Sequence, residues 1–337
     1  MRVVQCRIRK WLWLIAVLFV VYWVLPAKAT FPGVNGRITF ARFFPDQSES
    51  IFSIRPDGTG EKQLTFDAAN HFSEVSDWSP DGSRIAFHSD RNSTDSEFVI
   101  DIFTMKADGT DVVQLTSHAG QKVAPEYSPD GATIVFDKEG LPGVEGIYIM
   151  NASDGGNTRR VTAAPAGTFD FQPHFSPDGK RIVFTRALCA RGRAGCLATV
   201  HIVNADGSGL TQITPPGSDM HSFDWSPDGT KIALESEFDK ELPGSKNDIY
   251  IVNIDGSNLV NLTNNPPSFV GKPGTGTPCS RSGRPKWSPD GTKLVFWQGD
   301  CLGNPAIWIM NSDGSNRHKL VGDIRSDGFP DWGSNQD

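Results

Sequence analysis

Cysteine is scarce in this sequence, with five residues in a chain of 337. No Cys-x-x-Cys pair and no Cys/His zinc spacing occurs, so a structural zinc site is disfavoured. The formal net charge is -7 and no basic stripe stands out after the N-terminal segment, so we do not expect nucleic acid as a partner. The Gly-x-Ser-x-Gly elbow of serine hydrolases is also missing, which argues against that class of enzyme.

The N-terminal apolar run is short for a permanent membrane anchor. Trp11 to Leu25 spans fifteen residues, whereas a membrane-spanning helix needs about 20. Positive residues precede this run, and Ala27-Lys28-Ala29 follows it as a small-residue cleavage pattern. The pattern predicts a signal peptide over residues 1–29, with an uncleaved anchor as the alternative. We therefore expect an exported protein, periplasmic or extracellular, that touches a membrane only if the signal is retained.

Four cysteines remain after the predicted cleavage: Cys189, Cys196, Cys279 and Cys301. An even number in an oxidising compartment predicts disulfides, with metal binding as the weaker interpretation. The expected bonds are Cys189–Cys196 and Cys279–Cys301. The second bond would pin a long insertion, either to preorganise it for a partner or to protect it from proteases.

One motif returns five times and organises the chain: an aromatic residue, Ser-Pro-Asp-Gly, and then a short apolar run. The aromatic residues that open its copies are Trp78, Tyr127, Phe175, Trp225 and Trp287. Proline presets φ for a type I turn, aspartate suits the next position, and glycine accepts a positive φ. The apolar runs show no polar alternation, which predicts strands buried on both faces.

Each repeat contains a second turn around Asp-Gly, so it predicts four antiparallel strands. Equivalent isoleucines, from Ile38 to Ile232, recur every 47 to 50 residues, the period of a propeller blade. The first repeat lacks its first strand, and Phe329-Pro330-Asp331-Trp332 near the C-terminus matches one. We predict an all-β fold: a six-bladed β-propeller of four-stranded blades over residues 30–337, closed by the C-terminal strand, which completes the first blade.

The repeated aromatic-Ser-Pro-Asp-Gly-x-x-Ile-x-Phe resembles the repeat of the TolB propeller family, also called WD40-like or PD40 repeats. The resemblance covers essentially all of residues 30–337. It implies a six-bladed propeller and, because TolB is a periplasmic component of the Tol–Pal system, an envelope-associated partner. TolB carries an α/β domain ahead of its propeller, whereas here the first blade starts within about ten residues of the predicted cleavage site. We therefore expect a TolB-like propeller rather than TolB itself.

Strand order predicts two unlike faces of the disc. The Ser-Pro-Asp-Gly and Asp-Gly turns lie on one face, and the longer, variable connections lie on the other, among them 235–247 and 264–284. Variable loops on a rigid scaffold are where binding usually resides. The loop-bearing face, which also carries all four cysteines, is the predicted binding face.

The residue before each aromatic predicts a polar ring along the channel. Its members are Asp77, Glu126, His174, Asp224, Lys286 and Asp331. The structural interpretation is a channel wall, or side chains that bond neighbouring blades. The functional interpretation is a site for a cation such as calcium, or for a peptide, at the channel mouth, where Arg284 is a further candidate.

Histidines give a second candidate site. His71, His118, His174 and His221 fall near the predicted channel mouth in consecutive blades. The arrangement resembles propeller lyases that cleave pectic oligosaccharides and hold a divalent metal on histidines. The offsets from the turn glycines are uneven, so we expect scattered polar residues rather than a metal cluster.

The leading hypothesis is a non-catalytic, monomeric, exported propeller without a cofactor that binds a protein or peptide through its loop-bearing face and channel mouth. The alternative is a metal-dependent, carbohydrate-active lyase with its site in the channel.

Overall fold

The structure is a computed structural model that describes residues 33–94, 97–117, 120–140, 143–188, 197–214, 220–236, 247–264, 280–300, 305–322 and 326–334. Within these ranges the protein forms 24 β-strands. No helix long and apolar enough to cross a membrane occurs in the same ranges. The predicted signal peptide and all four cysteines lie outside the described residues, so the signal and the disulfides stay predictions.

The strands form six four-stranded sheets, which we number as blades 1 to 6. Blade 1 contains β24 (Ser326–Ser334), β1 (Asn35–Phe43), β2 (Glu49–Ile54) and β3 (Lys62–Gln63). Blade 2 contains β4 (Ser73–Trp78), β5 (Arg84–Ser89), β6 (Asp101–Lys106) and β7 (Val113–Gln114). Blade 3 contains β8 (Gln121–Tyr127), β9 (Thr133–Glu139), β10 (Gly146–Asn151) and β11 (Arg159–Arg160).

The second half of the ring repeats this plan. Blade 4 contains β12 (Thr168–Phe175), β13 (Arg181–Leu188), β14 (Leu197–Asn204) and β15 (Thr211–Gln212). Blade 5 contains β16 (Met220–Trp225), β17 (Lys231–Ser236), β18 (Asp248–Asn253) and β19 (Val260–Asn261). Blade 6 contains β20 (Ser280–Trp287), β21 (Lys293–Asp300), β22 (Ala306–Asn311) and β23 (His318–Val321).

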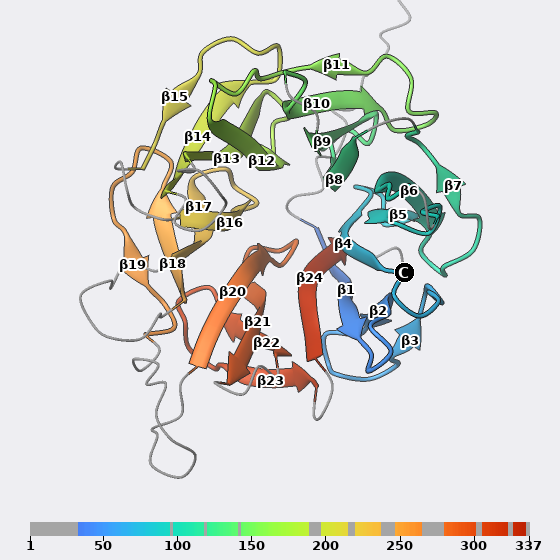
Figure 1. Ribbon diagram of the computed structural model, residues 1–337. Coiled ribbons are helices and arrows are strands. Elements are labelled where there is room, and N and C mark those ends of the chain that lie inside the picture. The colour runs from blue at the N-terminus through green and yellow to red at the C-terminus, as the bar shows by residue number, and fades with distance from the viewer. Residues whose placement is uncertain are drawn as a thin grey trace, which may run out of the picture.

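The six blades stand around a central axis as a closed propeller, which confirms the predicted fold (Figure 1). Closure is made by β24, which pairs antiparallel with β1 and places Trp332 opposite Ile38. A buried ion pair reinforces this junction: Arg42 on β1 donates to both carboxylate oxygens of Asp327 on β24, at 2.7 and 3.1 Å. The first and last described strands therefore belong to the same blade.

The hydrophobic core is divided into six clusters, and each draws its side chains from two neighbouring blades. The motif aromatics are at the centre of this packing: Trp78 of blade 2 packs with Ile51 and Leu64 of blade 1. The second strands are buried on both faces, as in β5, where Ile85 and Phe87 are fully buried. The apolar runs therefore stabilise the ring by joining blades as well as by filling them.

The Ser-Pro-Asp-Gly turns are built as the residue types predict. In blade 5 the Ser226 hydroxyl donates to Asp228 at 2.6 Å, and the Gly229 N–H donates to the Ser226 carbonyl at 2.8 Å. Gly229 has a φ of 68° and lies against Pro177 of the preceding blade, 3.7 Å from where a Cβ would stand. The left-handed backbone therefore favours glycine here, whereas the distance to Pro177 would leave room for a Cβ atom.

The first strands begin earlier than the sequence pattern predicted, because each continues through a β-bulge before its aromatic residue. Residues 280–284, expected in a loop, form the start of β20, and the register of β20 against β21 shifts between Gly283 and Lys286. Such a bulge breaks the alternation of side chains, which hides the strand from a pattern of period two. The bulge residues line one mouth of the central channel.

Candidate functional site

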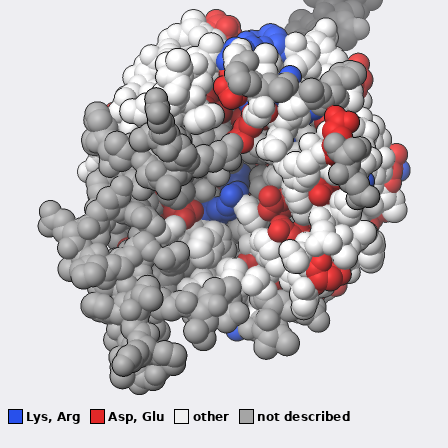
Figure 2. All heavy atoms as spheres, in the orientation of Figure 1, with Lys and Arg blue, Asp and Glu red and all other residues white. Residues whose placement is uncertain are grey.

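Six polar side chains meet where the first strands approach the axis. They are the residues that precede the motif aromatics: Asp77, Glu126, His174, Asp224, Lys286 and Asp331. We call them the axial ring. In the space-filling view the centre of the disc is hollowed, with Lys or Arg atoms inside it and Asp or Glu atoms beside them (Figure 2).

The carboxylates of the axial ring hold neighbouring blades together. Each accepts a hydrogen bond from the backbone N–H of the aromatic residue in the next blade. The pairs are Asp331–Trp78 at 3.1 Å, Asp77–Tyr127 at 2.8 Å, Glu126–Phe175 at 2.8 Å and Asp224–Trp287 at 2.7 Å. A carboxyl oxygen accepts such a hydrogen bond whether the group is ionised or protonated, so these four joints tie neighbouring blades together and contribute to ring stability.

Two positions of the axial ring, in blades 4 and 6, carry nitrogen instead of a carboxylate, and their side chains contact each other. The Lys286 ammonium lies 3.2 Å from Nδ1 of His174 and 3.8 to 3.9 Å from carboxylate oxygens of Asp224, Asp331 and Glu126. His174 is itself paired with Glu126. Lys286 is therefore a built-in cation that offsets the surrounding negative charge.

The charges of the ring shift one another's protonation. Burial raises the pKa of Asp224 to about 6, although Lys286 and His174 oppose the change. Burial and the nearby Asp331 raise the pKa of Asp77 well above its usual range. Burial disfavours the charged form of Lys286, but the attraction of Asp224 and the other ring carboxylates outweighs it and raises the lysine pKa. The lysine thus stays charged while part of the ring can hold protons.

This arrangement bears on the calcium hypothesis. A cation site needs carboxylate oxygens that converge on free space. Here the ammonium of Lys286 stands among these oxygens, and four carboxylates also accept backbone N–H groups. Among the described residues no group of three His, Cys, Asp or Glu side chains is placed to hold a metal ion. The geometry favours the interpretation of the ring as a connection between blades.

The axial ring separates two unequal mouths of the channel. On the turn-bearing face the mouth is lined by the motif prolines and aromatics, including Pro80, Pro129 and Trp225, and its cavity volume is ≈ 60 Å³. On the loop-bearing face the lining includes Arg284 and Phe329, and the cavity volume is ≈ 50 Å³. We call the second pocket the loop-side mouth. Both pockets are small, so either admits a side chain rather than a folded domain.

The loop-side mouth is built from the bulges of the first strands. The bulge residues have left-handed backbone, with φ between 49° and 53°: Ala124, Gln172, Ser222, Arg284 and Phe329. Four of them precede a proline that lines the pocket, namely Pro125, Pro173, Pro285 and Pro330. Non-glycine residues with positive φ are uncommon, and such strain persists where the surroundings hold it and often marks functional sites.

Side chains from neighbouring blades satisfy the bulge N–H groups. The N–H of Gln172 donates to Asp137, that of Ser222 to the side chain of Gln172, and that of Arg284 to Glu235, at 3.0 to 3.1 Å. Sequence reasoning missed this second set of joints. A signal for them exists, since Asp137 and Glu235 directly follow the apolar triplets of β9 and β17.

The four candidate histidines do not share one location. His174 belongs to the axial ring, whereas His71 lies in the connection between blades 1 and 2, where its Nδ1 is 3.3 Å from Asp90. His118 lies outside the described residues, and only the backbone of His221 is described, paired with Glu235 across the sheet. The structure thus does not bring His71 and His174 together.

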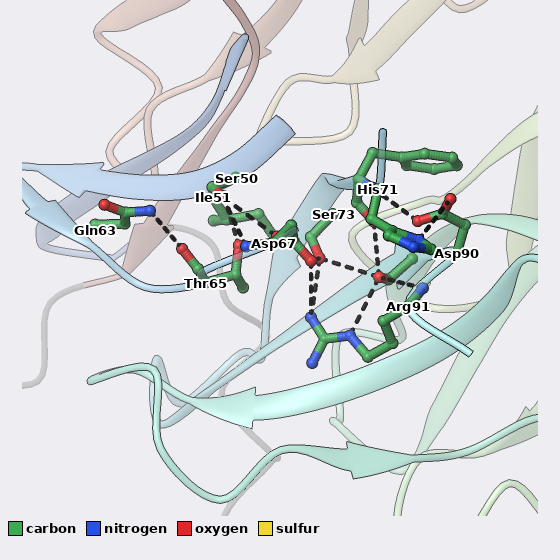
Figure 3. A network of polar contacts seen from close by, with 11 residues as sticks. Ser50, Ile51, Gln63, Thr65, Asp67, His71, Ser73, Asp90 and Arg91 are labelled. Carbon is green, nitrogen blue, oxygen red and sulfur yellow. Dashed lines mark hydrogen bonds and ion pairs between the residues drawn. The ribbon is translucent and has the colours of Figure 1, made fainter. Parts of the chain in front are cut away.

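The connection around His71 is a polar network that ties blade 1 to blade 2 (Figure 3). Arg91 donates to Ser73 at 2.9 Å, and Ser73 donates to Asp67 at 2.8 Å. Close by, Glu74 pairs with His88 at 3.3 Å, and burial together with the charge of Glu74 raises the pKa of Glu49 to about 8. Nothing in the repeat pattern singles out these residues, because they differ from blade to blade.

A closed ring of six four-stranded blades around an axial channel defines this protein as a six-bladed β-propeller. The family model described as the TolB beta propeller domain matches residues 93–193. A crystal structure of TolB from Acinetobacter baumannii superposes with a TM-score of 0.67 and 21% identity, covering 89% of this chain and 67% of that one. The protein is thus similar to TolB in its propeller fold, and residues 93–193 match the TolB propeller model.

Other similar proteins differ in their descriptions. Protein Atu1656 of Agrobacterium fabrum is 30% identical over 177 residues, 49% of this chain and 55% of that protein. The matches to two further relatives, both named as peptidases, span only 20% and 35% of their lengths. A structure of oligogalacturonate lyase in complex with manganese has the same fold, with a TM-score of 0.53 and 13% identity, covering 86% of this chain and 75% of the other. The propeller thus occurs in both enzymes and TolB proteins.

Proposed function

We propose that this protein is an exported, non-catalytic propeller that binds a segment of a protein partner in its loop-side mouth, in the cell envelope. It acts as a monomer and needs no cofactor. The N-terminal signal pattern supports export, and the likeness to TolB supports a partner in the envelope.

The observation that carries the proposal is the asymmetry of the channel. The turn-side mouth is lined by side chains that recur from blade to blade, whereas the loop-side mouth has individual ones, such as Arg284 and Phe329. Lys286 and its carboxylates line the base of both mouths. A pocket of ≈ 50 Å³ suits one side chain or chain end of a partner segment that lies across the mouth.

The rival function is a metal-dependent lyase in the channel. Its chemistry needs a divalent ion on the channel wall, where this protein has Lys286 bonded to His174 and close to Asp224. Replacing a metal by an ammonium leaves no vacant coordination position for a sugar oxygen at that point. The described geometry therefore supports binding over catalysis.

A capture experiment from the native envelope fraction tests the proposal. The bait is the mature protein, compared with Phe329→Asn, which removes the aromatic ring but tolerates the φ of 52° at this position. The matched control is Lys180→Ala, an exposed residue of the turn-bearing face. We expect one partner to be captured by the wild type and the control and to be reduced at least tenfold with Phe329→Asn.

Equal capture by all three baits would move the binding site away from the loop-side mouth. Depolymerisation of oligogalacturonate by purified protein that carries about one divalent metal per molecule would replace the proposal with the lyase.

A further inference from the structure

Arg284 is fixed at the loop-side mouth by its backbone. It occupies the β-bulge of β20, with a φ of 50°, and its N–H donates to Oε2 of Glu235 at 3.1 Å. Pro285 follows and restricts the backbone further. The side chain therefore starts from a rigid point on the pocket wall.

The guanidinium of Arg284 is held in place by an aromatic ring rather than by a carboxylate. Its central carbon lies 3.9 Å from the centre of the Phe329 ring, a close cation–π contact. Among the described residues, this guanidinium forms no ion pair with a carboxylate, and the acidic groups that act on it are Glu74 and Glu235. Two other arginines differ, since Arg42 and Arg186 each form a two-pronged pair with an aspartate.

The loop-side mouth does not provide a close counter-ion for Arg284. Burial lowers the pKa of Arg284, and only the more distant charges of Glu74 and Glu235 oppose this. Glu235 is already engaged by the Arg284 N–H and by Asn247. The guanidinium is thus partly removed from water without a close counter-ion, a state that an incoming anion would stabilise.

The rest of the mouth offers a ligand mainly apolar surface. Its lining includes Pro125, Pro173, Pro330 and Phe223. The bulge N–H of Gln172, which could otherwise bind an anion, already donates to Asp137. Lys286, at the base, is surrounded by the ring carboxylates. Of the two basic side chains that line the mouth, Arg284 and Lys286, Arg284 is the one that forms no ion pair with a carboxylate among the described residues.

We propose that Arg284 is the anchor for one carboxylate of the inserted partner segment, supplied by an Asp or Glu residue or by the terminal carboxylate of the partner polypeptide. This rests on the proposed function and names the chemistry that the mouth selects. A planar guanidinium binds a carboxylate through two parallel hydrogen bonds, and the Phe329 contact preorganises it, which lowers the entropic cost of binding.

The carboxyl groups near Arg284 limit how much negative charge the partner segment can carry. Glu74 and Glu235 lie near Arg284, and the axial ring below carries four more carboxyl groups. A strongly acidic segment would be repelled by this field. The recognised segment therefore carries a single carboxylate flanked by uncharged, mostly apolar residues that pack on the prolines.

The test uses short capped peptides as probes and the whole mature protein as receptor. One pair is Ac-Pro-Ala-Asp-Ala-Pro-NH2 and its Asn counterpart; a second pair is Ac-Pro-Ala-Ala with a free or an amidated C-terminus. Binding is followed by titration calorimetry and by the side-chain Nε–H signal of Arg284 in protein labelled with 15N-arginine. The two pairs separate an aspartate carboxylate from a terminal carboxylate as the source.

We expect at least one acid peptide to bind about tenfold tighter than its neutral counterpart and to shift the Arg284 signal, in keeping with a charge-assisted hydrogen bond. Arg284→Met should abolish this preference, Arg284→Lys should retain part of it, and Phe329→Asn should reduce it. Lys180→Met, which removes a positive charge from the turn-bearing face, should leave it unchanged. Thermal unfolding confirms that each variant is folded.

Several results would overturn the assignment. Equal binding of acid and neutral peptides at the mouth would refute the carboxylate anchor while leaving peptide binding intact. Tighter binding of trigalacturonate than of any peptide would assign the guanidinium to an acidic sugar. No binding of any probe, together with no partner capture sensitive to Phe329→Asn, would refute the anchor and the proposed function alike.

Discussion

The two mouths of the channel differ in how uniform they are. The turn-side mouth repeats one construction, with the same Ser–Asp hydrogen bond of 2.6 Å in blades 2 to 6. The loop-side mouth has the same backbone bulges but a different side chain at each of them, among them Ala124, Gln172 and Arg284. Uniform side chains serve the fold, since every blade needs them, whereas individual ones are free to serve one ligand.

The axial ring between the mouths contains both kinds of position. Four carboxylates perform the same task in four blades, which is to accept the N–H of the next aromatic residue. His174 and Lys286 depart from this rule and bond each other instead. The departure supplies positive charge where the repeated carboxylates would otherwise repel one another.

Removing that positive charge should have the largest effect. Lys286→Met leaves the ring carboxylates without their cation, so we expect a loss of about 4 kcal/mol in the free energy of unfolding at pH 7.5. The loss should shrink at pH 5, where the carboxylates can take up protons instead. Urea unfolding at both pH values measures it.

Lys231→Met, which removes an exposed lysine on β17, is the control and should change stability by less than about 0.5 kcal/mol. An equally small loss for Lys286→Met would mean that the ring does not depend on its internal cation.

Opening the closure of blade 1 should cost somewhat less. Asp327→Ala leaves the buried Arg42 with Glu61 as its remaining carboxylate partner, so we expect a loss of about 3 kcal/mol in urea unfolding. Asp111→Asn removes the charge of an exposed partner of Arg84, at a φ of 55° that asparagine tolerates, and should cost less than about 1 kcal/mol. Similar losses for the two variants would contradict the special role of the closing strand.

Asp224→Asn should change the pH dependence of stability. Because the pKa of Asp224 is raised to about 6 by folding, its contribution is fully present below about pH 4 and is lost as the pH rises through 6. We expect the stability difference between wild type and Asp224→Asn to shift by about 2 kcal/mol between pH 4 and pH 7, in favour of the variant at the higher pH.

The same comparison with Asp228→Asn, a turn residue whose pKa is lowered by the hydrogen bond from Ser226, should show no loss of wild-type stability in this window. A flat difference for Asp224→Asn would show that its carboxyl titrates as in the unfolded state.

Changes to the repeated turns should have the smallest effects, and they should be alike. Asp228→Ala removes hydrogen bonds to Ser226 and Thr230, so we expect a loss of about 1 kcal/mol. Asp81→Ala in blade 2 should match it, because Asp81 accepts the same three hydrogen bonds, from the Ser79 hydroxyl and from the N–H and hydroxyl of Ser83. Neither variant should alter partner capture, and a selective loss of capture would move binding to the turn-bearing face.

Much of the fold was predictable from the sequence because each repeat forms its turn through residues that are adjacent in the chain. The order Ser-Pro-Asp-Gly specifies a turn by itself, and five copies at a regular period specify the ring. The pairing of β24 with β1 was predictable too, since a motif without a strand after it matches a blade without a first strand. The starts of the first strands were not, because the bulges interrupt their alternation.

The candidate site was predictable only in part. The axial ring follows from one fixed offset to the motif, but the contact of Lys286 with His174 joins blades 6 and 4 through residues that are 112 positions apart. The stacking of Arg284 on Phe329 likewise depends on which rotamers the bulges allow. Contacts of this kind occur once and join distant residues, so they produce no repeated pattern from which the sequence could predict them.

Blade 1 combines β24 with β1, β2 and β3, and this pairing determines when the ring can close during synthesis. The bond between Arg42 and Asp327 joins residues separated by 285 positions, so it forms only after the strands of all six blades have been made. Until then the edge of β1 that pairs with β24 is unpaired, and an unpaired strand edge can associate with other chains. Synthesis of β24 is therefore the step that allows the row of blades to close into a ring.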